Sequence, residues 1–378
     1  MQTTLLGLGI AIILALVSAL AAPLVIDWNR YRPRFEQEAS RLTGLAVRVN
    51  GTIEARILPT PRIKLADVAV GAAGQKPQIQ AATLELEVSL GPLLRGEVEA
   101  TELHLVAPKI NLGLDRNGAV DWPSISPSLS PDRLTISHLT IDDGQAVLTD
   151  AASGFRLVLK ELAFKGDVRS FGGPFKGEGA FRSGDQVYGY RIAATWPEDG
   201  GALRLKVGVD PAGYQLTTEI EGSVNLEHGV PQFDGTLAAR PVTAALARGE
   251  RVTTDVWHLA GKLRMASASA SLQELAFQFG PEEAAINLNG SAELTLGEHP
   301  HLDGAISAKQ VDLDRALATP DAPLRPPFVL IRSAVEAFFA AAAKPPIPTK
   351  IAVALDAMTL GGSLLESVHG NIGFDGKG

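Results

Sequence analysis

The stretch TLELEVSL, from Thr83 to Leu90, decides how this sequence is expected to fold. Its apolar and acidic residues alternate with a period of two, which is the side-chain period of a β-strand. The apolar residues of one expected face are Leu84, Leu86, Val88 and Leu90. Glu85 and Glu87 would lie on the opposite face. One apolar and one polar face predict an antiparallel sheet whose two sides meet different surroundings.

The same alternation recurs along most of the chain. The further segments that show it are Glu102–Val106, Lys109–Leu114, Arg133–Ile141, Arg156–Leu159, Ala202–Val209, Tyr214–Ile220, Ala285–Leu288 and Ala292–Leu296. Gly, Pro, Asp or Asn lies in nearly every gap between them, as turns require. We therefore expect a mainly β fold with a long antiparallel sheet, in which Glu85, Glu87 and Lys109 belong to the solvated outer face.

A short helix and several turns are expected around these strands. Pro33 to Thr43 has Phe35, Ala39 and Leu42 at helical spacing, and Gly44 can end the helix. Asn50-Gly51 separates two β-prone runs and predicts a tight hairpin, while Pro59-Thr60-Pro61 precedes another strand. Asp142-Asp143-Gly144 indicates one more hairpin turn, and Asp312-Leu313-Asp314 a solvated strand or the start of a helix.

The N-terminus carries an uninterrupted apolar run from Leu5 to Ile26. As a helix it would span roughly 33 Å, and a bilayer core is about 30 Å thick. We favour a retained membrane anchor over a cleaved signal peptide, although Ala19-Leu20-Ala21 fits a cleavage site. The residues expected at the membrane interface are Trp28, Arg30, Tyr31 and Arg32. Their positive charges favour the cytoplasmic side but do not decide the orientation, because long domains can translocate regardless.

Composition excludes several functions. The chain has 378 residues, a net charge of −8, no basic tract and 6% aromatic residues, which disfavours nucleic acid as a partner. It contains no cysteine, so it has neither a thiol nucleophile nor a cysteine metal site. His299 and His301 lie two residues apart without a third ligand at suitable spacing. We expect no enzyme, no cofactor and no bound metal.

An internal repeat is suggested late in the chain. Val230–Leu246 is similar to His299–Arg315, and Asp234-Gly235 corresponds to Asp303-Gly304. A partial third copy begins at His369. Such repeats favour a sheet extended by similar strand units. The alternative is a chance likeness between two Asp-Gly hairpins.

A different segment runs from Pro320 to Pro348. It is rich in proline at both ends and encloses FVLIRSAVEAFFAAAA, Phe328–Ala343, which is expected to be a helix. The helix would either pack over the end of a sheet or act as a lid or plug over whatever the sheet encloses.

Several motifs occur in an order that resembles the start of the AsmA family. They are IDWNRYRP at Ile26–Pro33, LTG at Leu42–Gly44, VNGTI at Val49–Ile53, LPTP at Leu58–Pro61, LADV at Leu65–Val68 and LDRNGAVDW at Leu114–Trp122. The resemblance covers about the first 125 residues, and the later Asp-Gly repeats are similar to the family's later region. This chain is shorter than many members, so it is expected to be either a truncated chain or a short member, and a complete bridge between membranes is in doubt.

The resemblance implies a single-pass inner-membrane protein of a Gram-negative bacterium with its bulk in the periplasm. It implies kinship with bridge-like lipid transfer proteins, whose β-units curl into a long apolar groove. The lining would comprise Leu84, Leu86, Val88, Leu90, Leu103, Leu105, Ile110, Leu112, Ile136, Leu205 and Val207. Without the resemblance, the same apolar faces would favour a closed sandwich or barrel.

The expected regions follow the chain in order. Residues 1–28 form the transmembrane anchor, 29–125 the AsmA-like β-region with a short helix, and 126–319 the repeated β-groove region. Residues 320–348 form the Pro-bracketed helical segment, and 349–378 further strands. The leading hypothesis is phospholipid binding and shuttling along the groove, with a contribution to outer-membrane biogenesis. The alternatives are a non-enzymatic scaffold that contacts envelope proteins, and a hydrolase with hidden carboxylates.

Overall fold

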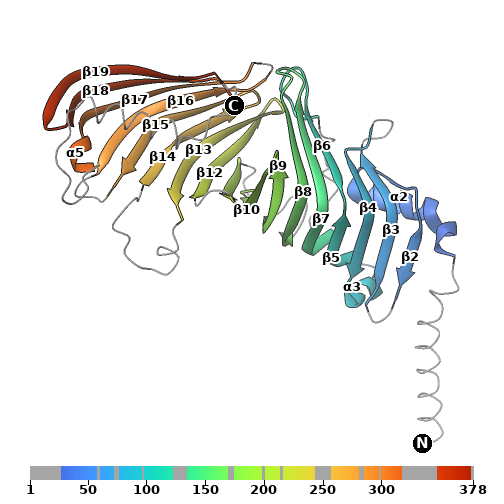
Figure 1. The fold of residues 1–378 in the computed structure, drawn as a ribbon. Helices are drawn as coiled ribbons and strands as arrows, with labels where there is room; N and C mark the ends of the chain where they lie inside the picture. The colour runs from blue at the N-terminus through green and yellow to red at the C-terminus, as the bar shows by residue number, and fades with distance from the viewer. Residues whose placement is uncertain are drawn as a thin grey trace, which may run out of the picture. The chain divides into compact units, whose positions relative to one another are not determined.

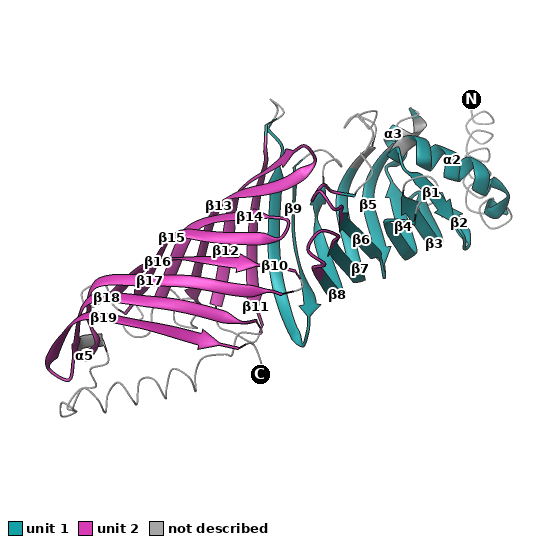
Figure 2. Cartoon of the chain, turned by 90° about the horizontal axis from the view of Figure 1, so that it is seen from above, with its two compact units in different colours: residues 1–113, 121–149, 157–201 teal, residues 114–120, 150–156, 202–378 magenta. Residues whose placement is uncertain are grey.

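The computed structural model shows a mainly β protein (Figure 1). The described residues are 27–57, 60–71, 76–95, 98–121, 134–168, 174–197, 201–212, 216–242, 257–280, 285–297, 299–316 and 347–375. Within them, 19 strands belong to one long, mostly antiparallel sheet. The chain divides into two compact units (Figure 2). Unit 1 comprises residues 1–113, 121–149 and 157–201, and unit 2 comprises 114–120, 150–156 and 202–378.

Unit 1 is built mainly from ten strands. They are β1 (Ala46–Val49), β2 (Ile53–Arg56), β3 (Arg62–Gly71), β4 (Ile79–Val88), β5 (Val98–Val106), β6 (Lys109–Leu114), β7 (Leu134–Asp150), β8 (Arg156–Val168), β9 (Phe175–Ser183) and β10 (Gln186–Thr195). The pairs β3–β4, β4–β5, β8–β9 and β9–β10 are antiparallel. β5 and β7 pair in parallel, and β6 pairs with the start of β4. The expected alternating segments of unit 1 thus lie in strands.

The predicted N-terminal helix is confirmed. A 3-10 turn, η1 (Trp28–Tyr31), leads into α2 (Arg32–Thr43), and Gly44 ends the helix with a left-handed φ of 69°. Phe35 and Ala39 pack against a core cluster of buried residues from the first strands. Its members are Val47, Val49, Ile53, Leu65 and Val68. α2 therefore covers the apolar side of β1–β3.

The hairpin predicted at Asn50-Gly51 is wrong, because β1 and β2 both pair with β3 and not with each other. The Asn50 N–H donates to the Asp67 carbonyl at 2.9 Å, and the Gly51 N–H donates to the Ala66 carbonyl at 3.1 Å. A Cβ on Gly51 would lie 2.7 Å from the Ala66 carbonyl oxygen. Glycine is required here by close backbone approach along one strand, and not by a reversal of the chain.

Two further local predictions are wrong for related reasons. Asp142-Asp143-Gly144 is not a turn, since β7 runs through it without reversing. Asp143 instead adopts a φ of 53°, which is typical of a β-bulge. Leu90 does not continue β4; it begins the short helix α3 (Leu90–Leu94) and is 40% exposed.

Unit 2 is a ladder of nine strands among the described residues. They are β11 (Leu203–Pro211), β12 (Leu216–Glu227), β13 (Val230–Pro241), β14 (Trp257–Ala266), β15 (Ser269–Phe279), β16 (Ile286–Thr295), β17 (His301–Asp312), β18 (Thr349–Leu360) and β19 (Ser363–Phe374). Neighbours from β11 to β17 are antiparallel, β17 and β18 are parallel, and β18 and β19 are antiparallel. The expected segments Ala285–Leu288 and Ala292–Leu296 are parts of the single strand β16.

A second core cluster lies at the end of the last strands of unit 2. It contains Ala308, Val311, Leu355, Met358 and Leu360. The short helix α5 (Leu313–Ala316) begins directly after β17, as the Asp312-Leu313-Asp314 pattern allowed, and Leu313 packs against this cluster. The Asp314 carboxylate accepts hydrogen bonds from the Gly361 and Gly362 N–H groups at 2.6 and 2.7 Å.

The two Asp-Gly pairs of the repeat lie in the middle of strands, Asp234-Gly235 in β13 and Asp303-Gly304 in β17. Reading them as hairpin turns is therefore wrong. Their partners differ, because Gly235 pairs with Gly222 whereas Gly304 pairs with Ala292. The repeat remains a prediction.

Several predictions fall outside the described residues. These are the anchor at residues 5–26, the turn residues 58–59 and the helix at residues 328–343. In the part of the chain that the structure describes, no helix has the length and hydropathy that crossing a bilayer requires.

Candidate functional site

The apolar residues of unit 2 line up across its strands. Residues paired across neighbouring strands lie on the same face of a sheet. The register gives one row of Leu203, Val224, Phe233, Met265, Ala270, Leu294, Leu302, Thr349 and Phe374. A second row on the same face is Leu205, Gly222, Gly235, Leu263, Leu272, Ala292, Gly304, Ile351 and Ile372. We call this side the unit 2 apolar face; neither row contains a charged residue.

The opposite side of the same strands is charged. Its ion pairs join neighbouring strands, with Nε of Arg264 3.0 Å from Asp234 and Nζ of Lys206 3.1 Å from Glu221. These side chains are more than half exposed. The sheet of unit 2 thus has one side suited to water and one that is not.

Little of the described chain covers the unit 2 apolar face. Leu205, Ile220, Leu237 and Leu272 are only half-buried, whereas Phe233 and Leu263 are buried, each with 6% of its surface exposed. The described elements that β11–β15 contact most are their sheet neighbours. A closed sandwich would need a second sheet over this face, and the described residues of unit 2 supply none.

Phenylalanine rings cover glycine pairs on the apolar side of both units. In unit 2, a Cβ on Gly222 or Gly235 would lie 2.7 or 2.8 Å from Cζ of Phe233. In unit 1, Phe164 covers the paired Gly166 and Gly177 in the same way. A ring over a cross-strand glycine replaces the packing that the glycines lack and permits a strong local bend.

Unit 1 has a corresponding apolar side. One row is Ile63, Leu86, Leu103 and Leu139, and the next is Leu65, Leu84, Leu105 and Ile141. On the other side of β4, Glu85 lies 2.8 Å from Nζ of Lys64. The hydrogen bond from Lys64 lowers the pKa of Glu85, and the same bond raises the pKa of Lys64.

The structure places the eleven residues predicted to line a groove in three settings. Leu86, Leu103 and Leu105 lie together, half-buried, on the apolar side of unit 1, whereas Leu84 also packs against the helix-covered core, and Val88 and Ile136 are buried. Leu205 and Val207 lie on the unit 2 apolar face. Ile110 and Leu112 are in β6, where Leu112 is 36% exposed, and Leu90 is in α3.

An aromatic cluster on β9 and β10 was missed by the sequence reasoning. Phe181 stacks on Tyr188 with ring centroids 5.3 Å apart and meets Tyr190 at 5.8 Å. The Tyr190 hydroxyl donates to the Ala163 carbonyl at 3.0 Å, and burial raises the pKa of Tyr190 to about 12. The available signal was the period-two spacing of Tyr188 and Tyr190 in QVYGYRI.

The four residues predicted at a membrane interface also separate. Trp28 packs against the first core cluster, and Nη2 of Arg32 donates to the Gly51 carbonyl at 2.7 Å. Arg30 and Tyr31 are exposed. Only these two present their side chains to the surroundings, and a membrane role for all four remains a prediction.

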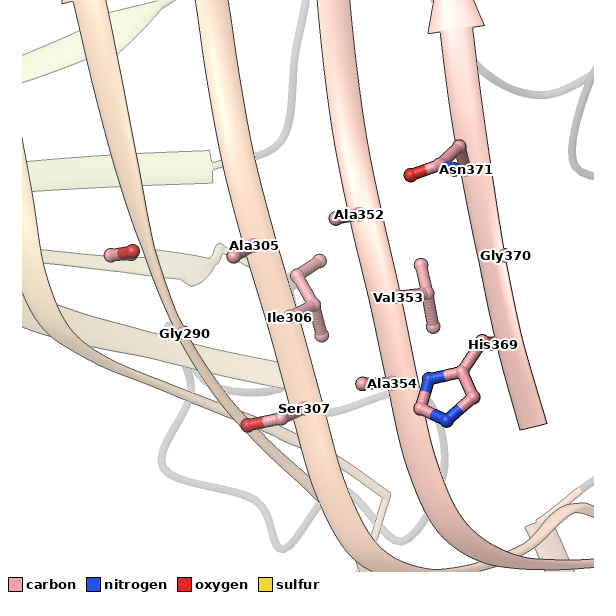
Figure 3. A pocket seen from close by; sticks show the side chains of 11 residues that line it. Gly290, Ala305, Ile306, Ser307, Ala352, Val353, Ala354, His369, Gly370 and Asn371 are labelled. Atoms are coloured by element: carbon pink, nitrogen blue, oxygen red, sulfur yellow. The ribbon is translucent and has the colours of Figure 1, made fainter. Parts of the chain in front are cut away.

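A hollow of about 520 Å³ lies over β16–β19 (Figure 3). Seven of its eleven lining residues, among them His369 and Asn371 at one end, belong to the polar side of these strands and are mostly small, while Ile306 and Val353 belong to a row of the apolar side. It gathers no acid, base or nucleophile triad. Within the described residues, no group of three His, Asp or Glu side chains could hold a metal ion.

Within the described residues, these features define a class: a β-sheet protein with one apolar face that no second sheet covers, and a charged back on the opposite side. Residues 2–186 match the model of the AsmA family, so this part of the chain is an AsmA family domain. Comparisons with curated proteins and with solved structures give no match. The family is generally non-enzymatic and belongs to the bacterial envelope.

Proposed function

We propose that this protein is anchored in the inner membrane by its N-terminal apolar run, with its bulk in the periplasm. There it binds phospholipid on its apolar faces and shuttles it along a curved groove, contributing to outer-membrane biogenesis. It acts without catalysis or a cofactor. The observation that carries the proposal is the register of unit 2, in which two uncharged rows cross nine strands and no second sheet among the described residues of this unit covers them.

The physical need for such a face is large. Moving a lipid through water exposes its tails at about 0.8 kcal/mol per CH₂, so a sixteen-carbon chain costs roughly 12 kcal/mol. An apolar surface that continues from strand to strand removes most of that barrier. Strand spacing of about 4.8 Å makes the nine-strand face nearly 40 Å wide, which exceeds the thickness of one bilayer core.

The proposed lining includes the half-buried leucines of unit 1 and the rows of unit 2. Arg30 and Tyr31 are the exposed candidates for contact with lipid headgroups, since aromatic and cationic side chains suit that depth. The charged back, held by ion pairs such as Lys206–Glu221, would face the aqueous periplasm.

The test is mass spectrometry of organic extracts from the detergent-purified full chain. We expect phospholipid in the extract, and less of it from Leu86→Asp, which places a charge on the apolar side of unit 1. Glu85→Asp is the matched control because residue 85 belongs to the opposite side. A folded protein without lipid would refute the proposal and favour a scaffold that acts through protein contacts.

A further inference from the structure

The sheet edge in unit 1 is blocked by side chains of the N-terminal helices. The Val47 N–H donates to Ser40 Oγ at 2.9 Å, and the Val49 N–H donates to Glu36 Oε1 at 2.7 Å. The Ile53 N–H donates to Asn29 Oδ1 at 3.1 Å. Three of the amides that β1 and β2 turn away from β3 are thus satisfied by side chains, which hinders the pairing of a further strand there.

The edge formed by β19 in unit 2 is different. Successive residues of a strand direct their backbone N–H and C=O groups alternately to its two sides. The Leu302 N–H donates to the Pro348 carbonyl at 2.9 Å, so even-numbered residues at the start of β18 direct their backbone groups to β17. The odd-numbered residues Thr349, Ile351 and Val353 therefore direct theirs to β19. Their partners in β19 are Phe374, Ile372 and Gly370, whose backbone groups face β18.

It follows that His369, Asn371 and Gly373 direct their backbone groups away from β18. Among the described residues, β18 is the strand that pairs with β19. Edge strands are usually protected by lysine, proline or inward charges. The sequence of β19, SLLESVHGNIGF, contains a single charged residue, Glu366, and no proline or lysine. Among the described residues, the protection of this edge is limited to Glu366 and a bulge at Ser367, and both precede the stretch that begins at residue 368.

We propose that the β19 edge pairs with the β19 edge of a second copy of this chain, antiparallel and about a two-fold axis at Asn371. Because side chains occupy most of the unit 1 edge, an isologous contact between two β19 edges is favoured over a head-to-tail arrangement. The bulge at Ser367, whose φ is 56°, leaves residues 368–374 as the regular part of β19. Asn371 is the middle of this stretch, so an axis at Asn371 lets all seven residues pair with the second copy.

This register is self-complementary on both sides of the sheet. It places Val368 opposite Phe374 and Gly370 opposite Ile372 on the apolar side, where glycine leaves room for the larger partner. On the polar side, His369 lies opposite Gly373. Both Gly370 and Gly373 have open space beside them in the single chain, since a Cβ on either would have no atom within 4 Å. Three hydrogen-bonded pairs would form about six backbone hydrogen bonds. The axis is perpendicular to the sheet, so both apolar faces would lie on one side and form one continuous surface.

The natural absence of cysteine makes a direct test possible. In Asn371→Cys, the two thiols would face each other across the axis at a Cα separation of about 5.5 Å, which a disulfide can bridge. The matched control is Ala352→Cys, an exposed residue directly beside Asn371 on β18. Its mate in the second copy would lie three strand spacings away, about 14 Å, beyond the reach of a disulfide.

The experiment oxidises native membranes that contain each full-length variant and separates the proteins on a non-reducing gel. We expect Asn371→Cys to shift from 39.8 kDa to twice that mass and Ala352→Cys to stay at the mass of a single chain. Equal cross-linking of the two variants, no cross-linking of either, or a Asn371→Cys adduct with a different protein would each overturn the proposal.

A proline variant removes the contact without cutting the ladder to β18. Asn371→Pro deletes an N–H that points outward, a position where edge strands tolerate proline. We expect wild-type protein in detergent to sediment as a dimer and Asn371→Pro as a monomer, with the same β content by circular dichroism. A wild-type monomer at every concentration, or a dimer that survives in Asn371→Pro, would refute the proposed interface. Neither result depends on whether lipid is bound.

Discussion

Aspartate placed at Gly370 should weaken lipid binding, and aspartate placed at Gly373 should not. Both glycines are in β19, and a Cβ at either meets no atom within 4 Å, so neither substitution creates a clash within the chain. Gly370 pairs with Val353 on the apolar side, whereas Gly373 pairs with Lys350 on the polar side. The two variants have identical composition and net charge, so within one chain they differ only in the face that receives the carboxylate.

The expected size of the effect follows from the strand spacing. An acyl chain that crosses β19 covers about 4.8 Å of the sheet, the width of one strand, and places roughly four CH₂ groups over it. A carboxylate there stays hydrated and prevents the burial of these groups. At about 0.8 kcal/mol per CH₂, the loss is about 3 kcal/mol, which corresponds to roughly a hundredfold in affinity.

The assay is displacement of a fluorescent fatty-acyl probe from the purified full chain by phospholipid, with unfolding temperature as the control for folding. Gly370→Asp should raise the dissociation constant by roughly a hundredfold, and Gly373→Asp should leave it within about threefold of wild type. Equal affinities for the two folded variants would show that lipid does not use the unit 2 apolar face at β19.

Three other substitutions test the packing and the ionisation described above. Phe233→Ala should lower the free energy of unfolding by about 3 kcal/mol in urea titrations, because it uncovers Gly222 and its partner, while Phe233→Leu should retain most of the stability. The pKa of Tyr190 is raised to about 12 in the folded state, so the stability that its neutral form contributes is present below pH 10 and is lost as the pH rises toward 12. Because Tyr190 ionises at such a high pH, Tyr190→Phe should remove the last step of an ultraviolet titration of the tyrosine hydroxyls. The pKa of Glu85 is lower in the folded state than its unfolded value of 4.5, so ionised Glu85 stabilises the fold above pH 4.5. This stabilisation is lost as the pH falls through the lower pKa of the folded state. Glu85→Gln should therefore flatten the acid side of the stability profile, and an unchanged profile would contradict the role of its pair with Lys64.

The alternation of apolar and polar residues was sufficient to predict the type of fold. TLELEVSL predicted β4 with Leu84 and Leu86 on one side, and the register confirms both on the apolar side of unit 1. The helix at Pro33–Thr43 was equally readable because Phe35 and Ala39 repeat at helical spacing and Gly44 can adopt a left-handed conformation. These features depend on neighbours in sequence.

Features that depend on distant residues were not readable. Asn50-Gly51 carries the local signal of a hairpin, but the partner that decides its conformation is β3, which both flanking strands join. Similarly, nothing near β17 in the sequence shows that its partner after residue 316 is parallel. The aromatic cluster was missed because glycine interrupts the apolar positions of β9, and only the cross-strand partners bring Phe181 onto Tyr188.

The period of two also fails at bulges, and these failures keep the apolar sides continuous. In β15 the register shifts between Leu272 and Leu275, and Glu274 between them has a φ of 49°. In β3, Leu65 and Val68 belong to the same core cluster although they are three residues apart, and Asp67 between them has a φ of 50°. A left-handed conformation at a non-glycine residue costs about 1–2 kcal/mol. That cost is offset because each bulge returns the next apolar residue to the same face and increases the local twist. Strands of ten or more residues can thereby bend without presenting their leucines to the charged back, which is the condition for a long one-sided sheet.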